Sequence, residues 1–229
     1  MWYNIIMPII RNINQDFFKS WSNNMSYVLG FFAADGSMIR NKRGSCFIEF
    51  KICDLDLLEN IKQALGSDHK ISRRVVKNKK WKNIYRLQIG SKEIFQDLEK
   101  IGFTQAKTKN LKFPEVPKEY IGDFIRGYFD GDGCISYGHY KTKDRKENKF
   151  TFSTRFTCGD KKFLLVLKDK LSLNLKGGFI VKKERGYELV YSHKDSLALF
   201  DILYNNIPRC IFLEIKYSKF KEIHKILKM

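Results

Sequence analysis

Two carboxylate-bearing segments with the same internal spacing are the residues of this chain most suited to chemistry. One ends at Asp35-Gly36 and the other at Asp132-Gly133, and each follows a hydrophobic run with a glycine in its middle. Two carboxylates that converge from such a repeat could hold divalent metal ions. Bound metal can activate water and stabilise a leaving oxygen, so this site would suit phosphodiester hydrolysis. Oxygen ligands favour Mg²⁺, for which Mn²⁺ could substitute.

The hydrophobic run before each aspartate is predicted to be a helix. Gly30 and Gly127 lie in the middle of these runs, where a glycine costs about 1 kcal/mol relative to alanine. Two glycines at matched positions therefore predict two helices that cross too closely for a side chain to fit between them. Asp35 and Asp132 would lie at the helix C-termini, where the helix dipole disfavours negative charge. A shared cation would compensate for this.

The similarity between the two halves continues after these helices. Alternating segments predict strands, and apolar residues at helical spacing predict helices. The matched segments are 46–52, 54–65, 71–89 and 92–101 in the first half, and 150–157, 160–171, 178–191 and 194–203 in the second. The chain is therefore predicted to be an α+β protein of tandem pseudo-twofold αββαββα repeats, with two antiparallel sheets that form a saddle.

The repeat predicts four parts of the chain. They are an N-terminal extension (1–22), a first half (23–110), a linker (111–119) and a second half (120–229). Pro114 and Pro117 stiffen the linker, and Pro117 is well placed to begin the second motif helix. The apolar N-terminus is short, contains Pro8 and lacks a basic leader. It is expected to pack onto the body of the protein rather than to act as a signal peptide or to span a membrane.

Charge is the strongest global signal in the composition. The 229 residues include 43 Lys and Arg against 25 Asp and Glu, a net charge of +18. This excess goes beyond what solubility requires and indicates a polyanionic partner, most commonly nucleic acid. A hydrophobic content of 43% excludes a disordered tail protein.

Metal sites built on cysteine or histidine are not expected. The five cysteines form no Cys-x-x-Cys pair and the four histidines are isolated, which argues against zinc and against a disulfide framework. A reducing compartment, either an organelle or a bacterial cytoplasm, fits better. A calcium loop beginning at Asp130 is also excluded, because no further acidic ligands follow at the required spacing.

The segments Val28–Gly36 and Ile125–Gly133 resemble the two LAGLIDADG motifs of single-chain homing endonucleases. The resemblance covers nearly the whole chain, because the order of the predicted elements matches as well. It implies a monomer that cuts both strands of a long, partly palindromic DNA duplex across the minor groove and leaves short 3′ overhangs. Asp35 and Asp132 would each serve the cutting of one strand, and the metal site would include the preceding residues Ala34 and Gly131.

The chain departs from the motif of that family at two positions. Ala33 stands where the second copy has Asp130, and Arg126 replaces a small residue. Both copies keep the last aspartate, which is the metal-binding position in the family. The resemblance further implies a basic residue after the third helix of each half, at Lys107 and Lys216. Such a lysine could stabilise charge on the phosphate or orient the attacking water.

The two hairpins of each half are predicted to bind DNA, because a twisted antiparallel ribbon fits the major groove. Arginine and glutamine can read bases, whereas most lysines would contact phosphates. The candidates in the first half are Arg40, Lys42, Arg43, Lys51, Arg73, Arg74, Lys77, Lys79, Lys80, Lys82, Arg86 and Gln88. Those in the second half are Tyr137, His139, Lys141, Lys143, Arg145, Arg155, Lys182, Lys183 and Arg185.

Two alternative functions stay open at this point. Some proteins of the family act as RNA maturases that assist intron splicing, and a basic, aromatic surface would serve that role too. Others bind DNA without cutting it. Retention of both aspartates and both lysines argues against a protein that only binds. The target sequence is not encoded in any motif, since base choice depends on side-chain geometry and DNA bending.

Overall fold

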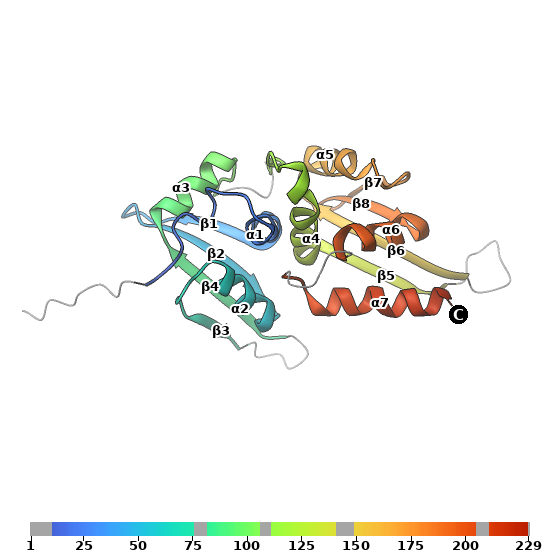
Figure 1. The fold of residues 1–229 in the computed structure, drawn as a ribbon, viewed down its shortest axis with the longest axis horizontal. Helices are drawn as coiled ribbons and strands as arrows, with labels where there is room; N and C mark the ends of the chain where they lie inside the picture. Colours follow the sequence, from blue (N-terminus) through green and yellow to red (C-terminus); the bar gives the residue numbers. More distant parts are fainter. Residues whose placement is uncertain (1–10, 76–81, 106–110, 141–148, 205–210, 229) are drawn as a thin grey trace, which may run out of the picture.

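The computed structural model describes residues 11–75, 82–105, 111–140, 149–204 and 211–228, and it contains two similar halves that lie side by side (Figure 1). The first half consists of α1 (Asn23–Asp35), β1 (Gly36–Arg40), β2 (Cys46–Ile52), α2 (Leu55–Ala64), β3 (Ile71–Arg74), β4 (Ile84–Gly90) and α3 (Lys92–Ile101). The second half begins with a short 3₁₀ helix, η2 (Lys118–Tyr120). It continues with α4 (Ile121–Asp132), β5 (Gly133–Tyr140), β6 (Lys149–Cys158), α5 (Lys161–Leu171), β7 (Phe179–Lys183), β8 (Gly186–Ser192), α6 (His193–Tyr204) and α7 (Glu214–Lys228).

The predicted αββαββα order is confirmed in both halves, and α7 follows it as an additional helix. The two sheets share one topology, with strand orders β1-β2-β4-β3 and β5-β6-β8-β7, and all pairings are antiparallel. Pro117 precedes η2, which runs directly into α4. No helix of the described segments is both long enough and apolar enough to cross a membrane.

Each sheet has one face covered by helices and one open face. In the first sheet, Ile48, Phe50, Leu87 and Ile89 are fully buried on the covered face, against which α2 and α3 pack. Because side chains alternate along a strand, the residues between them, such as Glu49 and Gln88, belong to the open face. The second sheet follows the same rule, with α5, α6 and α7 on its covered face.

Local hydrogen bonds explain where the helices begin. Asp54 and Asp160 are the N-caps of α2 and α5. The Asp54 carboxylate accepts a hydrogen bond from the Leu57 backbone N–H at 2.9 Å, and the Asp160 carboxylate accepts one from that of Lys162 at 2.7 Å. Such caps satisfy amides that have no partner within the helix. They fix the ends of α2 and α5 beneath the two sheets.

The helices α1 and α4 cross at the centre of the molecule and join the two halves (Figure 1). A Cβ atom added at Gly30 would lie 2.0 Å from the carbonyl oxygen of Phe124, and one added at Gly127 would lie 2.0 Å from that of Tyr27. Neither helix could carry a side chain at the crossing without moving the other backbone. The bulky residues next to the glycines point away from the crossing: Phe32 packs on Phe50, and the equivalent Phe129 packs on Phe156.

Candidate active site

The C-terminal ends of α1 and α4 line a single pocket of about 210 Å³. Its walls are formed by Ala33, Ala34, Asp35, Gly36, Leu111, Tyr128, Asp132, Cys158 and Gly159. Both motif aspartates therefore border the same space. The helix ends also touch, because a Cβ atom added at Gly131 would lie 2.4 Å from that of Ala34 and 3.2 Å from a carboxylate oxygen of Asp35.

The donor atoms at this pocket fit a hard divalent cation. Asp35 and Asp132 supply carboxylate oxygens. Ala34 also lines the pocket and Gly131 lies against it, and the Gly131 carbonyl oxygen is 3.4 Å from the ammonium nitrogen of Lys216. Within the described segments, no group of three or more His, Cys, Asp or Glu side chains could hold a metal ion. This is compatible with Mg²⁺, which is usually held by one or two carboxylates together with waters and substrate phosphates.

Lys216 lies beside this pocket, in the first turn of α7. Its ammonium group donates hydrogen bonds to the carbonyl oxygens of Phe129 at 2.5 Å and Asp130 at 2.8 Å. These carbonyls belong to the last turn of α4, where the Phe129 carbonyl also accepts a hydrogen bond from the backbone N–H of Gly133. Burial lowers the pKa of Lys216 to about 8, although the nearby charges of Asp130, Asp35 and Asp132 act in the opposite direction. The side chain therefore places a cation near the carboxylates of Asp35, Asp130 and Asp132.

Asp130 is a buried carboxylate that connects both halves of the protein. It accepts hydrogen bonds from the hydroxyl of Tyr27 on α1 at 2.8 Å, from that of Tyr204 on α6 at 3.2 Å, and from the Leu213 backbone N–H at 2.8 Å. Burial raises the pKa of Asp130 to about 6, against the opposing charge of Lys216. In the sequence, Asp130 stood out only as a mismatch with Ala33. Its partners lie too far apart in the chain for the sequence to reveal them.

Arg126, the second departure from the motif, supports the same region. Its guanidinium is buried and forms an ion pair with Asp123 at 2.5 Å. It also donates to the carbonyl oxygens of Leu203 and Ile211, each at 3.1 Å. Asp123 in turn accepts a hydrogen bond from Asn23 of α1 at 2.8 Å. A small residue at position 126 would leave these carbonyls without this donor.

The open face of the first sheet carries several of the predicted DNA-binding residues. Lys51, Arg86 and Gln88 lie on it, with Arg74 further along at the edge strand. A buried acid, Glu49, forms ion pairs with both Lys51 and Arg86. Burial raises the pKa of Glu49, but hydrogen bonds from Lys51 and Arg86 outweigh burial and lower it below its usual value. The sequence reasoning missed Glu49, although its place in the alternating run 46–52 indicated it.

The second sheet repeats this arrangement with different residues. Glu188 lies 4.0 Å from Arg155 and 3.5 Å from Lys183, and Arg155 donates to Ser136 at 2.8 Å. The open face of β6 also carries hydroxyl side chains that the prediction omitted. They are Thr151, Ser153 and Thr157. These residues could have been predicted from the sequence, because they alternate with the apolar residues of the same strand.

Some predicted DNA-binding side chains lie on the covered faces instead. The Arg40 guanidinium is 3.3 Å from Glu99 and lies over the ring of Phe95, both on α3. The Tyr137 hydroxyl donates to Glu222 of α7 at 2.8 Å. Tyr137 lies within β5, which runs to Tyr140, and strand alternation turns its side chain toward the helices. By the same alternation, the covered faces also include three other predicted residues, His139, Arg73 and Lys182.

The remaining predicted residues divide into two groups. Lys42, Arg43, Lys82 and Arg185 are exposed in or near the turns of the hairpins. Seven other predicted residues lie outside the described segments. They are Lys107, Lys77, Lys79, Lys80, Lys141, Lys143 and Arg145.

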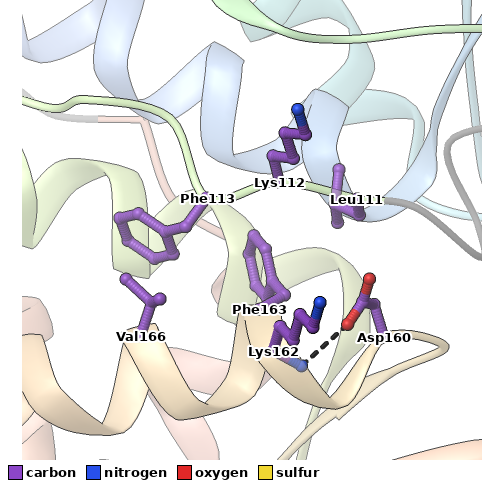
Figure 2. Close-up of a pocket in the computed structure, with 7 residues that line it drawn as sticks. All are labelled: Leu111, Lys112, Phe113, Asp160, Lys162, Phe163 and Val166. Atoms are coloured by element: carbon purple, nitrogen blue, oxygen red, sulfur yellow. Dashed lines mark hydrogen bonds between the residues drawn. The ribbon is translucent and has the colours of Figure 1, made fainter.

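A larger pocket of about 610 Å³ lies between the linker and the start of α5 (Figure 2). It is lined by Leu111, Lys112, Phe113, Asp160, Lys162, Phe163 and Val166. Its single carboxylate, Asp160, is the N-cap of α5, and the rings of Phe113 and Phe163 are 5.2 Å apart. These residues attach the linker to the second half. We therefore place the candidate active site in the smaller pocket, which holds two carboxylates.

Comparison with protein families agrees with this architecture. Residues 22–102 match a LAGLIDADG-like domain, and residues 125–227 match a LAGLIDADG endonuclease domain. The chain therefore belongs to the LAGLIDADG endonuclease family, and it carries one family domain in each half. The two matched regions contain α1, most of α4 and both sheets.

Solved structures of this family share the fold at low sequence identity. The meganuclease I-SmaMI bound to uncleaveable DNA is 15% identical, with a TM-score of 0.60 over 89% of this chain and 90% of that protein. The LAGLIDADG homing endonuclease I-LtrWI bound to target DNA is 17% identical, with a TM-score of 0.61 over 94% and 92% of the two chains.

Two proteins of Methanocaldococcus jannaschii are similar in sequence. An uncharacterized protein is 26% identical over 205 residues, which cover 84% of this chain and 72% of that protein. Reverse gyrase is 32% identical over 122 residues, which are 52% of this chain and 7% of that protein. The second similarity concerns only a small part of reverse gyrase.

Proposed function

We propose that this protein is a site-specific double-strand DNA endonuclease that depends on a divalent metal ion, Mg²⁺ or Mn²⁺. The observation that carries the proposal is the convergence of Asp35 and Asp132 on one pocket at the ends of two crossing helices. Membership of the LAGLIDADG endonuclease family supports the same conclusion. The net charge of +18 and the two open sheet faces are suited to a long DNA duplex.

The residues at the pocket would divide the work. Asp35 and Asp132 would hold the metal, together with the carbonyls of Ala34 and Gly131, and each carboxylate would serve one strand. When bound, the metal would supply activation of water and stabilisation of the leaving 3′ oxygen. Lys216 would stabilise negative charge that develops at the phosphate. With a pKa of about 8, it would be mostly protonated at neutral pH. Lys107 is proposed as its counterpart in the first half.

The two halves would divide the recognition of DNA. Both carboxylates come from one chain, so a monomer would suffice to cut both strands. The open faces differ in sequence, so the target would be only partly palindromic. The family resemblance implies cuts across the minor groove with short 3′ overhangs. Phosphate contacts would orient the duplex, and side chains on the open strands would read the bases.

A cleavage selection tests this function directly. The protein is incubated with a randomised duplex library in Mg²⁺, cleaved molecules are sequenced, and a selected target is placed in a supercoiled plasmid. We expect the intact protein to linearise the plasmid, and Asp35→Asn or Asp132→Asn to nick it. The double variant should retain binding without cutting. Metal-dependent cutting that survives in the double variant would refute the site. Binding without cutting by the intact protein would indicate a DNA-binding module.

A further inference from the structure

The open faces of the two sheets carry different kinds of side chain at several equivalent positions. One row across the first sheet contains Ser37, Glu49 and Gln88, and the equivalent row of the second sheet contains Cys134, Arg155, Val190 and Phe179. The adjacent rows contain Lys51, Arg86 and Ser72 in the first sheet, and Thr157, Glu188 and Val181 in the second. Gln88 of β4 and Ser72 of β3 are thus replaced by Val190 of β8 and Val181 of β7, whereas Arg86 is replaced by the acid Glu188.

Phe179, Val181 and Val190 form an apolar cluster on the β7–β8 ribbon. Val190 lies directly opposite Phe179 in the strand register, and Val181 is the next residue of β7 on the same face. Their neighbours in β8, Leu189 and Tyr191, are buried beneath the sheet, so the cluster belongs to the open face. Phe179 is 56% exposed. This exposed apolar area is unfavourable in water and suits a partner with apolar groups.

The surroundings of the apolar cluster favour a polyanion as that partner. Arg155 is paired with Val190 across the sheet, and Lys183 lies at the end of the same ribbon. Both cations share one acid, Glu188, at 4.0 and 3.5 Å, so this part of the face carries a net positive charge. A second protein copy or a lipid surface would have to desolvate these cations, whereas DNA would pair them with phosphates. A two-stranded antiparallel ribbon also has the dimensions of the major groove.

Thymine is the base that presents an apolar group in the major groove, its 5-methyl group. We propose that Phe179, Val181 and Val190 recognise thymine methyl groups in the half-site bound by the second sheet. At the position equivalent to Val190, the first sheet has Gln88, whose amide suits adenine. The two half-sites would therefore differ at symmetry-related positions. This inference rests on the proposed function, because it requires that the open face bind DNA.

Replacing thymidine by deoxyuridine tests the inference, because it removes the methyl group and leaves base pairing intact. Burying one such group contributes about a fourfold gain in affinity. A target chosen by parallel binding and cleavage selections should contain thymines whose replacement weakens binding about fourfold each. The probe is this duplex with deoxyuridine at single positions, and the readout is fluorescence anisotropy.

Three variants connect the effect to the apolar cluster. Val190→Gln and Val181→Ser introduce the polar residues found at the equivalent positions of the first sheet, Gln88 and Ser72, and Phe179→Ala removes an exposed ring. Each should lose the difference between thymidine and deoxyuridine at its own position. Leu173→Ala is the matched control, because Leu173 is a 79% exposed apolar residue in the turn after α5, away from the sheet face. It should keep the full difference.

The outcomes separate this inference from the proposed function. Cleavage of selected targets with no effect of deoxyuridine would overturn the inference and leave the nuclease assignment intact. Methyl-dependent binding without cleavage would support the inference and refute the nuclease assignment. A methyl effect that persists unchanged in all three variants would place recognition elsewhere and overturn it. The inference would also be overturned if Phe179→Ala converted a dimer of the protein to a monomer and left the methyl effect unchanged.

Discussion

The crossing of α1 and α4 makes a sharp prediction about Gly127. Replacing it by alanine would place a Cβ atom 2.0 Å from the Tyr27 carbonyl oxygen and 2.8 Å from the Phe31 nitrogen. Both obstacles are backbone atoms, so no side chain can rotate away. Ordinary contact begins at 3.4 Å, and the two helices would have to separate to reach it. The carboxylates at their ends would move apart as a result.

The expected loss of stability follows from two opposing terms. Overpacking a tight interface costs about 3 kcal/mol when the surroundings cannot yield. Alanine in place of a helical glycine stabilises the helix by about 1 kcal/mol. The net loss for Gly127→Ala is therefore about 2 kcal/mol, which corresponds to a melting temperature lower by about 4–8 °C in a chain of this size. DNA cleavage should fall as well.

Gly122→Ala is the matched control on the same helix. A Cβ atom there would lie 3.4 Å from the Ile202 carbonyl oxygen, an ordinary contact. This variant should be more stable than the unmodified protein by about 0.5–1 kcal/mol. Urea unfolding followed by circular dichroism measures both changes. A Gly127→Ala protein as stable as Gly122→Ala would refute the close crossing. In the double variant with Gly30→Ala, the second substitution should cost less than the first, because the helices are already apart.

Three further predictions concern the site and the open faces. Lys216→Met should reduce the cleavage rate about 10²–10³-fold with little change in DNA affinity. Lys219→Met, on the exposed side of α7, should leave the cleavage rate unchanged. An equal loss of cleavage in both variants would refute the role of Lys216. The pKa of Glu49 is lowered in the folded protein. The carboxylate therefore stabilises the fold above the usual carboxylate pKa, and this contribution is lost as the pH falls through the lowered pKa. Between pH 7 and pH 3, the free energy of unfolding measured in urea should fall less for Glu49→Gln than for the unmodified protein. Raising the salt concentration from about 50 to about 200 mM should weaken DNA binding about 10³-fold or more in anisotropy titrations, and a salt-independent affinity would contradict recognition through the basic open faces.

Much of the fold could be predicted because its signals are local and occur twice. The alternation in 46–52 and 150–157 and the helical spacing in 54–65 and 160–171 describe the same elements in each half. The paired glycines also predict a helix crossing without any knowledge of the rest of the chain. Each of these features depends on spacing along one segment, which the sequence states directly.

The parts that could not be predicted depend on contacts between distant segments. Asp130 has partners at positions 27, 204 and 213, and no spacing rule brings these together. Arg40 and Tyr137 were assigned to the DNA surface from charge and polarity, but strand parity turns both toward helices. Which face of the sheet a side chain occupies can be read from the sequence only when the limits of the strand are known. Strand β5 extends further than its loop-like sequence indicates.

The hydrogen bond between Tyr27 and Asp130 breaks the pseudo-twofold symmetry of the interface. Alignment of Gly30 with Gly127 makes Phe124 the counterpart of Tyr27 and Ala33 the counterpart of Asp130. Two copies of the first half would leave the buried Tyr27 hydroxyl without this acceptor, and two copies of the second half would bury Asp130 against an aromatic ring. The first pairing would leave a buried hydroxyl unsatisfied, and the second would remove one of the three hydrogen bonds to the buried Asp130. The central helices thus encode a preference for unlike partners, which leaves each half able to diverge in its DNA preference without reverting to a symmetric pair.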